Sequence, residues 1–229
     1  MINYFQKRKL MLLAQKKHFL PEINEYLLAN QKFDDKQKIS ETRFVVFDTE
    51  TTGLDSQKDQ IIAISGISVQ NFDVFLADSF ETLINQNSSG TTESICVHEL
   101  FVSDLLKGNT EPQAIIDFLK FIKNAVLVAQ HASFDISMLN YALKKHWEIA
   151  LLNQHIDTVF LAKKINMWQG NNFVLQNNYS LDKLCEKYEI LIPKRHTASG
   201  DSLATALLFV KMLGIAEKKG VQMVTELLE

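Results

Sequence analysis

The stretch FVVFDTETTGL, residues 44–54, joins a short apolar run to two acidic residues. A run rich in β-branched and aromatic residues that closes on a glycine predicts a buried strand. Because side chains alternate between the faces of a strand, Asp48 and Glu50 should lie on the same face. Two neighbouring carboxylates repel each other and are costly to desolvate, so a cation should lie beside them. Oxygen ligands favour Mg²⁺ or Mn²⁺. A solvated acidic turn is the alternative that these two residues alone leave open.

Length and composition narrow the class of protein. The 229 residues suit one domain with an appendage or two small domains, and 46% hydrophobic residues can build a sizeable core. A net charge of −3 argues against a protein that coats nucleic acid through its overall charge, so any such contact must be local. Cys96 and Cys185 match no metal spacing and indicate free thiols in a reducing cytoplasm. No apolar run reaches transmembrane length, so we expect a cytoplasmic protein without a membrane partner.

Residues 1–40 differ in composition from the rest of the chain. Over the first 24 residues the only acid is Glu22, whereas the basic residues include Lys7, Arg8, Lys9, Lys16 and Lys17. Rough helical spacing, which Pro21 interrupts, predicts one or two helices followed by a polar linker. We interpret this segment as a helical basic extension. Its charges either face solvent on a helix packed against the main domain or form an arm that contacts nucleic acid or a partner.

Residues 43–215 have the pattern of an α/β domain. Three strands joined by short links, one within 44–54, one at 60–69 and one at 72–84, predict an antiparallel meander. Strands and helices then alternate. The expected strands are 125–129 and 155–157. The expected helices are 95–107, 110–123 with a capping box at Thr110, 133–146, one from Thr158, one that Ser180 caps, one from Ser199 to 213, and a C-terminal helix at 216–229.

This order predicts a mixed five-stranded sheet with helices on both faces. Ligands of such sheets gather at the carboxyl ends of the strands, where Asp48 and Glu50 lie. Two more acids, Asp135 and Asp201, open predicted helices, and His196 precedes the second by five residues. Two divalent cations would neutralise four carboxylates in one site. Two such ions can clamp both the attacking and the leaving oxygen of a phosphoryl displacement. A histidine at the rim of such a site can accept a proton from the attacking water.

Three segments resemble, in order and separation, the motifs of the DEDDh (DnaQ-like) 3′–5′ exonucleases: FDTETTGL at 47–54, ASFD at 132–135 and HTASGD at 196–201. Residues 179–188, YSLDKLCEKY, are similar to the helix before the third motif in the proofreading (epsilon) subunit of bacterial DNA polymerase III. The resemblance covers about 43–213 and implies an RNase H-like fold.

The resemblance also implies the roles of the acids. Four carboxylates would hold two Mg²⁺ or Mn²⁺ ions, and His196 would be the general base. The implied ligands are Asp48, Glu50, Asp135 and Asp201. Asp157 matches a family position that we interpret as structural and not as a ligand.

Three residues are implied to bind the terminal nucleotide. Thr49 would contact it through the backbone, and Leu54 would act as an apolar wedge. His98 resembles the family histidine near the 3′-terminal sugar, although a helix-surface residue is the alternative. Gln130 and His131 replace the family's His-Asn pair, which affects a substrate contact but not the metals.

The expected function is hydrolysis of the 3′-terminal phosphodiester of single-stranded DNA with release of nucleoside 5′-monophosphates. The same chemistry on RNA ends or short oligonucleotides is the alternative, because the 2′-hydroxyl is discriminated by contacts that a sequence does not display. A non-catalytic nucleic-acid-binding module is disfavoured because all five expected catalytic residues are present. The resemblance implies a DNA polymerase as partner, whereas the early end of the chain after the third motif favours a free-standing enzyme.

Overall fold

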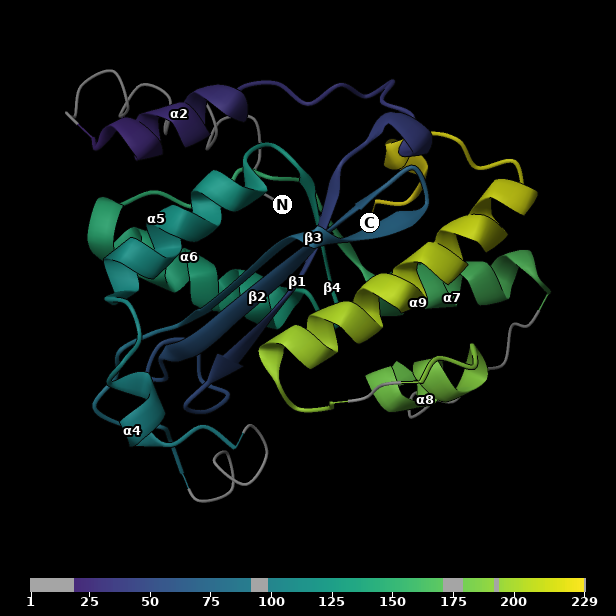
Figure 1. The fold of residues 1–229 in the computed structure, drawn as a ribbon. Helices are drawn as coiled ribbons and strands as arrows, with labels where there is room; N and C mark the ends of the chain where they lie inside the picture. Colours follow the sequence, from purple (N-terminus) through teal and green to yellow (C-terminus); the bar gives the residue numbers. More distant parts are fainter. Residues whose placement is uncertain (1–18, 92–98, 171–178, 192–193, 229) are drawn as a thin grey trace.

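The computed structural model describes residues 19–91, 99–170, 179–191 and 194–228. Its centre is a five-stranded sheet in the order β3-β2-β1-β4-β5 (Figure 1). The strands are β1 (Phe44–Thr51), β2 (Ile61–Gln70), β3 (Asp73–Leu83), β4 (Val126–Ala129) and β5 (His155–Asp157). β1 to β3 form an antiparallel meander, whereas β4 runs parallel to β1 and β5 parallel to β4. The predicted mixed sheet of five strands is confirmed.

β1 lies at the centre because it is apolar on both faces. Phe44 and Val46 contribute to the hydrophobic cluster on one face, and Val45 and Phe47 contribute to the cluster on the other. A strand buried on both sides is expected to show a continuous apolar run in its sequence, as β1 does. The alternation continues into the acids, so Asp48 shares the face of Phe44 and Val46.

Helices cover both faces of the sheet, as predicted (Figure 1). The cluster around Val45 and Phe47 is completed by α2 (Pro21–Ala29), α5 (Glu111–Ile122) and α6 (Ser133–Trp147). The cluster around Phe44 and Val46 is completed by α7 (Thr158–Trp168), α8 (Leu181–Lys187) and α9 (Ala198–Lys218).

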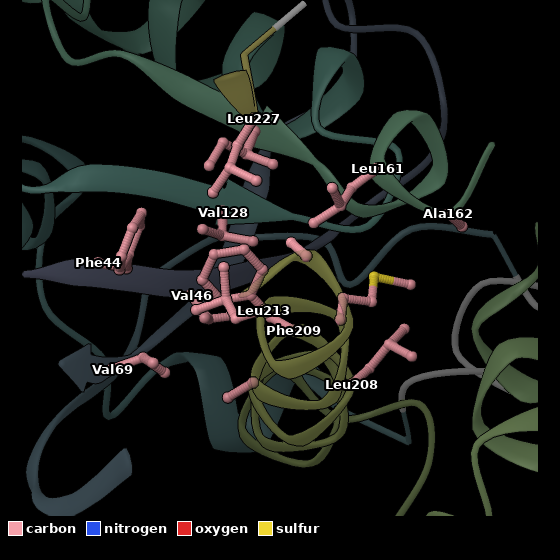
Figure 2. Close-up of a cluster of buried hydrophobic side chains, with 14 of the residues drawn as sticks. Phe44, Val46, Val69, Val128, Leu161, Ala162, Leu208, Phe209, Leu213 and Leu227 are labelled. Carbon is pink, nitrogen blue, oxygen red and sulfur yellow. The ribbon is translucent and has the colours of Figure 1, made fainter. Parts of the chain in front are cut away.

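α9 is the main helix of the second face. Figure 2 shows Phe209 and Leu213 of α9 pointing toward β1 and β4. The rings of Phe44 and Phe209 meet edge to face with centroids 5.0 Å apart. By length and composition α9 could cross a membrane, but a single such helix is weak evidence and half of its apolar window is buried inside the protein.

The described part of the N-terminal segment packs on the main domain, which is one of the two arrangements expected for it. Pro21 begins α2, because proline suits the first turn of a helix. Ile23, Tyr26 and Leu27 are buried, and α2 packs on α5. The Tyr26 hydroxyl donates to Asn153 Oδ1 (2.7 Å) and accepts from the Leu152 backbone N–H (2.7 Å). The basic residues between 7 and 17 lie outside the described residues.

The predicted C-terminal helix at 216–229 is wrong. α9 continues to Lys218, and Gly220 follows with φ +82°, a conformation that favours glycine and ends helices. The chain then turns back, and the backbone N–H groups of Ile39 and Val224 donate to the carbonyls of Gln222 (2.9 Å) and Gln37 (3.0 Å). The 3-10 turns Ile39–Glu41 and Val224–Glu226 therefore lie beside each other.

The helix predicted from Thr110 is confirmed as α5 with Thr110 as its N-cap, but its capping and the helix predicted at 95–107 differ from the structure. The capping box at Thr110 is not formed, because Gln113 donates instead to Asp117 (3.0 Å). In place of the helix at 95–107, the described residues hold only α4 (Val102–Leu105). There the backbone N–H of Phe101 donates to Asp104 Oδ2 (3.2 Å). Phe101 is therefore the N-cap, and the helix begins at Val102.

Candidate active site

Three of the predicted carboxylates meet at the carboxyl end of β1. Asp48 and Glu50 continue the face of β1 that α9 covers, and Asp201 lies in the first turn of α9. Oxygen atoms of these three side chains lie within 4.8 Å of one another. β1, β4 and β5 are parallel, so this is the edge at which all three strands end. The structure thus unites acids that the sequence separates by 153 positions.

Close packing holds the start of α9 against the sheet. The hydroxyls of Ser65 on β2 and Ser202 on α9 are hydrogen-bonded at 2.9 Å and buried. Thr197, and not the predicted Ser199, is the N-cap, and its hydroxyl accepts from the Gly200 N–H (3.1 Å). A Cβ at Gly200 would overlap the Lys194 carbonyl oxygen. Residue 200 must therefore be glycine for the loop at 194–197 to close onto the helix.

Asp135 approaches from the opposite face of the sheet. It lies in the first turn of α6, where an acid suits the helix dipole, and it is 4% exposed. Thr49 points to that face and donates to Asp135 Oδ1 through both its backbone N–H (3.1 Å) and its hydroxyl (2.5 Å). Asp135 is near enough for its charge to raise the pKa of Asp48 and Glu50.

The carboxylates destabilise one another's charged forms. Burial and the charges of Asp135, Glu50 and Asp201 raise the pKa of Asp48 well above its usual range. Burial and neighbouring acids raise the pKa of Glu50 to about 7. Burial also raises the pKa of Asp135 to about 7, although the hydrogen bonds from Thr49 oppose the shift.

The other predicted site residues differ in how closely they approach this cluster. The His196 backbone N–H donates to Asp201 Oδ1 (3.2 Å), and its side chain is exposed. Leu54 is 86% exposed on the turn after β1. Because the N–H of Thr49 already donates to Asp135, its predicted backbone contact with a nucleotide stays a prediction. His98 lies outside the described residues.

Gln130, His131 and Asp157 organise the ends of β4 and β5. Asp157 Oδ1 accepts from the backbone N–H groups of Val159 (2.8 Å) and His131 (3.2 Å), so it caps α7, in agreement with the structural role expected for it. Gln130 donates to the Tyr179 carbonyl (2.7 Å) and accepts from the Thr158 hydroxyl. The Gln130 side chain thereby ties β4 to the start of α7 and to Tyr179, two residues before α8.

One ion-pair network was missed. Arg195 donates through Nε to Asp182 Oδ1 (2.6 Å) and through Nη1 to Asp201 Oδ1. Asp182 belongs to α8 and carried no signal that would pair it with an arginine 13 positions later. In the sequence, the only indication of this ion-pair network was the basic residue Arg195 beside His196.

The comparison with known proteins decides the family. The exonuclease (RNase T) family profile matches residues 45–209, the segment that contains all four acids. The chain belongs to this exonuclease family. It carries a DnaQ-like 3′–5′ exonuclease domain and is similar to the corresponding part of larger polymerases. It is 35% identical over 190 residues to the PolC-type DNA polymerase III of Caldanaerobacter subterraneus, covering 82% of this chain and 13% of that protein. It is 34% identical over 193 residues to the Bacillus subtilis PolC-type DNA polymerase III, covering 83% of this chain and 13% of that protein.

Solved structures show that the exonuclease domain has the expected RNase H-like fold. Cell-death related nuclease 4 superposes with a TM-score of 0.66 at 15% identity, covering 77% of this chain and 65% of that one. E. coli Exonuclease I in complex with a dT13 oligonucleotide gives 0.65 at 12% identity, covering 79% and 43%. Exonuclease X in complex with duplex DNA gives 0.60 at 20%, covering 81% and 96%.

The donor set of the exonuclease site fits a hard divalent cation. All the converging ligand atoms are carboxylate oxygens, and no thiol or imidazole belongs to the cluster among the described residues. Mg²⁺ and Mn²⁺ prefer such oxygens. A bound cation would oppose the upward shifts in the pKa of Glu50 and Asp135 and favour their ionised forms at neutral pH.

The raised pKa values of Glu50 and Asp135 predict how the stability of the metal-free exonuclease depends on pH. Glu50 and Asp135 ionise near pH 4 in the unfolded chain but only at about pH 7 in the folded one. The stability that they contribute is present below about pH 4 and is lost as the pH rises through about 7. In chelator we expect the Tm to fall between about pH 5 and 8, and Mg²⁺ to reverse the fall at about pH 8. Thermal melts with and without Mg²⁺ test this, and the fall should be smaller in Asp135→Asn. A fall of the same size in wild type and Asp135→Asn would contradict the account.

Proposed function

We propose that this chain is a metal-dependent 3′–5′ exonuclease that releases nucleoside 5′-monophosphates from single-stranded DNA. The observation that carries the proposal is the convergence of Asp48, Glu50 and Asp201 within 4.8 Å, with Asp135 beside them, in a domain of the exonuclease family. A partly buried group of acids at this density needs cations, and a phosphodiester displacement is the reaction that two adjacent cations serve.

The four acids would hold two Mg²⁺ or Mn²⁺ ions. When bound, such ions stabilise the charge that develops on the attacking and leaving oxygens of a phosphoryl displacement. Asp48 and Glu50 supply ligands from a rigid strand, and Thr49 fixes Asp135 through two hydrogen bonds. Ligands on regular elements keep their positions more precisely than ligands on loops.

His196 would act as general base and take a proton from the attacking water. Its backbone hydrogen bond to Asp201 places it at the rim of the acid cluster, while its exposed side chain remains accessible from solvent. Leu54 would contact the terminal base as an apolar wedge. The turn that carries it is ordered by Asp59, which accepts from the Thr52 hydroxyl (3.0 Å) and the Asp55 N–H (2.8 Å).

Polarity and product are tested with three DNA substrates: a single strand and a blunt duplex that carry a 5′ label, and a circular single strand that is labelled internally. We expect a single strand to be shortened one nucleotide at a time from its 3′ end, with mononucleotides as the other product. A blunt duplex should be cut poorly, because a wedge at Leu54 needs an unpaired base. A circular single strand, which has no end, should remain intact. Internal cleavage of the circle would contradict an exonuclease.

The substrate and the partner are finer parts of the proposal. The E. coli Exonuclease I that shares this fold was crystallised with a DNA oligonucleotide, which supports single-stranded DNA as substrate. The PolC-type relatives are DNA polymerases and support a polymerase as partner, although the chain spans only 13% of their length. Matched DNA and RNA strands in the same assay distinguish the two substrate classes. Co-elution with a replicative polymerase in size-exclusion chromatography tests the partner.

A further inference from the structure

Arg195 connects the acid cluster to a second carboxylate outside it. Its Nε donates to Asp182 at 2.6 Å, and its Nη1 donates to Asp201. The Arg195 and Asp201 side chains are 21% and 14% exposed, whereas that of Asp182 is 62% exposed. The arginine therefore bridges a nearly buried acid and a solvated one. Arginine suits such a bridge because its planar fork presents separate N–H groups to two acceptors.

The same carboxylate of Asp201 belongs to the proposed metal site. Its oxygen lies within 4.8 Å of ligand atoms from Asp48 and Glu50. The positive charge of Arg195 also opposes the upward shifts in the pKa of Asp48 and Glu50, so it acts on the whole cluster. A guanidinium and a metal ion would thus share Asp201 as a partner, and both would act through their charge on Asp48 and Glu50.

The backbone around Arg195 is held in place while its side chain has two partners. Gly200 packs directly under the Lys194 carbonyl, and the His196 N–H is hydrogen-bonded to Asp201. Asp182 lies in the first turn of α8, beside α9 (Figure 1). An exchange at this site therefore requires only the guanidinium to move.

We propose that Arg195 is a built-in counter-cation, which neutralises the acid cluster when no metal is bound and competes with the divalent cation for Asp201. Asp182 is its second anchor, which retains the guanidinium when Asp201 binds metal. This inference rests on the proposed function, because it assumes that the cluster binds metal. It assigns Arg195 and Asp182 as positioning residues that set the affinity for metal.

Mn²⁺ titration of the full-length protein by calorimetry, without nucleic acid, tests the inference. R195Q should bind Mn²⁺ about tenfold more tightly, since a competing charge is removed. D182N should bind Mn²⁺ more weakly than wild type, because Arg195 then has only Asp201 as a partner. The double variant should match R195Q, because Asp182 acts through Arg195. R195K, which keeps the charge but loses the fork, should fall between wild type and R195Q.

Melting temperature provides an independent readout of the same exchange. In chelator R195Q should melt below wild type, since the acids lose their counter-ion, and saturating Mn²⁺ should close this gap. If R195Q and R195K lower the Tm equally with and without Mn²⁺ and leave the Mn²⁺ affinity unchanged, Arg195 is a structural ion pair and the inference is overturned. D48N distinguishes a failure of the role assigned to Arg195 from a failure of the proposed metal site. If D48N binds Mn²⁺ as tightly as wild type, the metal site itself, and with it the proposed function, fails.

Discussion

Asp48→Asn is expected to lower the turnover of a single-stranded oligonucleotide by about 10³-fold or more, since a catalytic metal contributes several kcal/mol to the transition state and about 1.4 kcal/mol corresponds to a factor of ten. Asparagine keeps the size of the side chain but removes a charge that repels those of the other acids in the cluster. The measurement is the initial rate of mononucleotide release at saturating Mg²⁺.

Stability should change in the opposite direction in this variant. The metal-free site is strained by repulsion among its acids, so removing one charge should raise the Tm in chelator above about pH 7. A loss of activity together with a gain of stability is the signature of a functional site. Asp73→Asn, at an exposed residue that begins β3, is the matched control and should change neither quantity. Wild-type turnover in Asp48→Asn would remove Asp48 from the catalytic site.

His196→Ala is expected to lower kcat by about 10²–10⁴-fold, the usual contribution of a positioned base. The loss should occur with little change in metal binding, because no imidazole atom belongs to the acid cluster among the described residues. In wild type the rate should rise with pH and then level off, since only a neutral imidazole accepts a proton. The variant should lose this rise. The measurement is kcat against pH for both proteins.

The competing interpretation is that His196 only packs against the start of α9. Its exposed side chain makes that role small, so removing it should cost little stability. The backbone at residue 196 has φ +61°, a conformation that asparagine tolerates better than alanine does. His196→Asn is therefore the second variant, because it removes the base with less strain. Near-normal turnover and an unchanged pH profile in both variants would show that His196 is not the base.

Local patterns predicted the sheet and the acids well because each depends on a few neighbouring residues. The alternation within β1 placed Asp48 and Glu50 on one face, and the same alternation turned Thr49 toward Asp135. Parallel strands ending at one edge then brought the acids together. Such arguments need only the period of a strand and the direction of its neighbours.

Features that depend on distant partners were missed. A helix packed against the domain was one of two arrangements expected for the N-terminal segment, but the contact of Tyr26 with Asn153, 127 positions away, is not visible in the sequence. The C-terminal turn was expected to be a helix, because its apolar residues do not reveal that they pair with the chain near Ile39. The bridge from Asp182 through Arg195 to Asp201 likewise depends on how α8 lies against α9.

The central claim is that this acid cluster hydrolyses the 3′-terminal phosphodiester only with divalent metal. The most direct measurement is the rate at which a 5′-labelled single strand of DNA loses its 3′-terminal nucleotide, first in Mg²⁺, then in excess chelator, then with Mg²⁺ restored. The account predicts stepwise shortening that stops in chelator and resumes when the metal returns. Shortening at the full rate in excess chelator would contradict it.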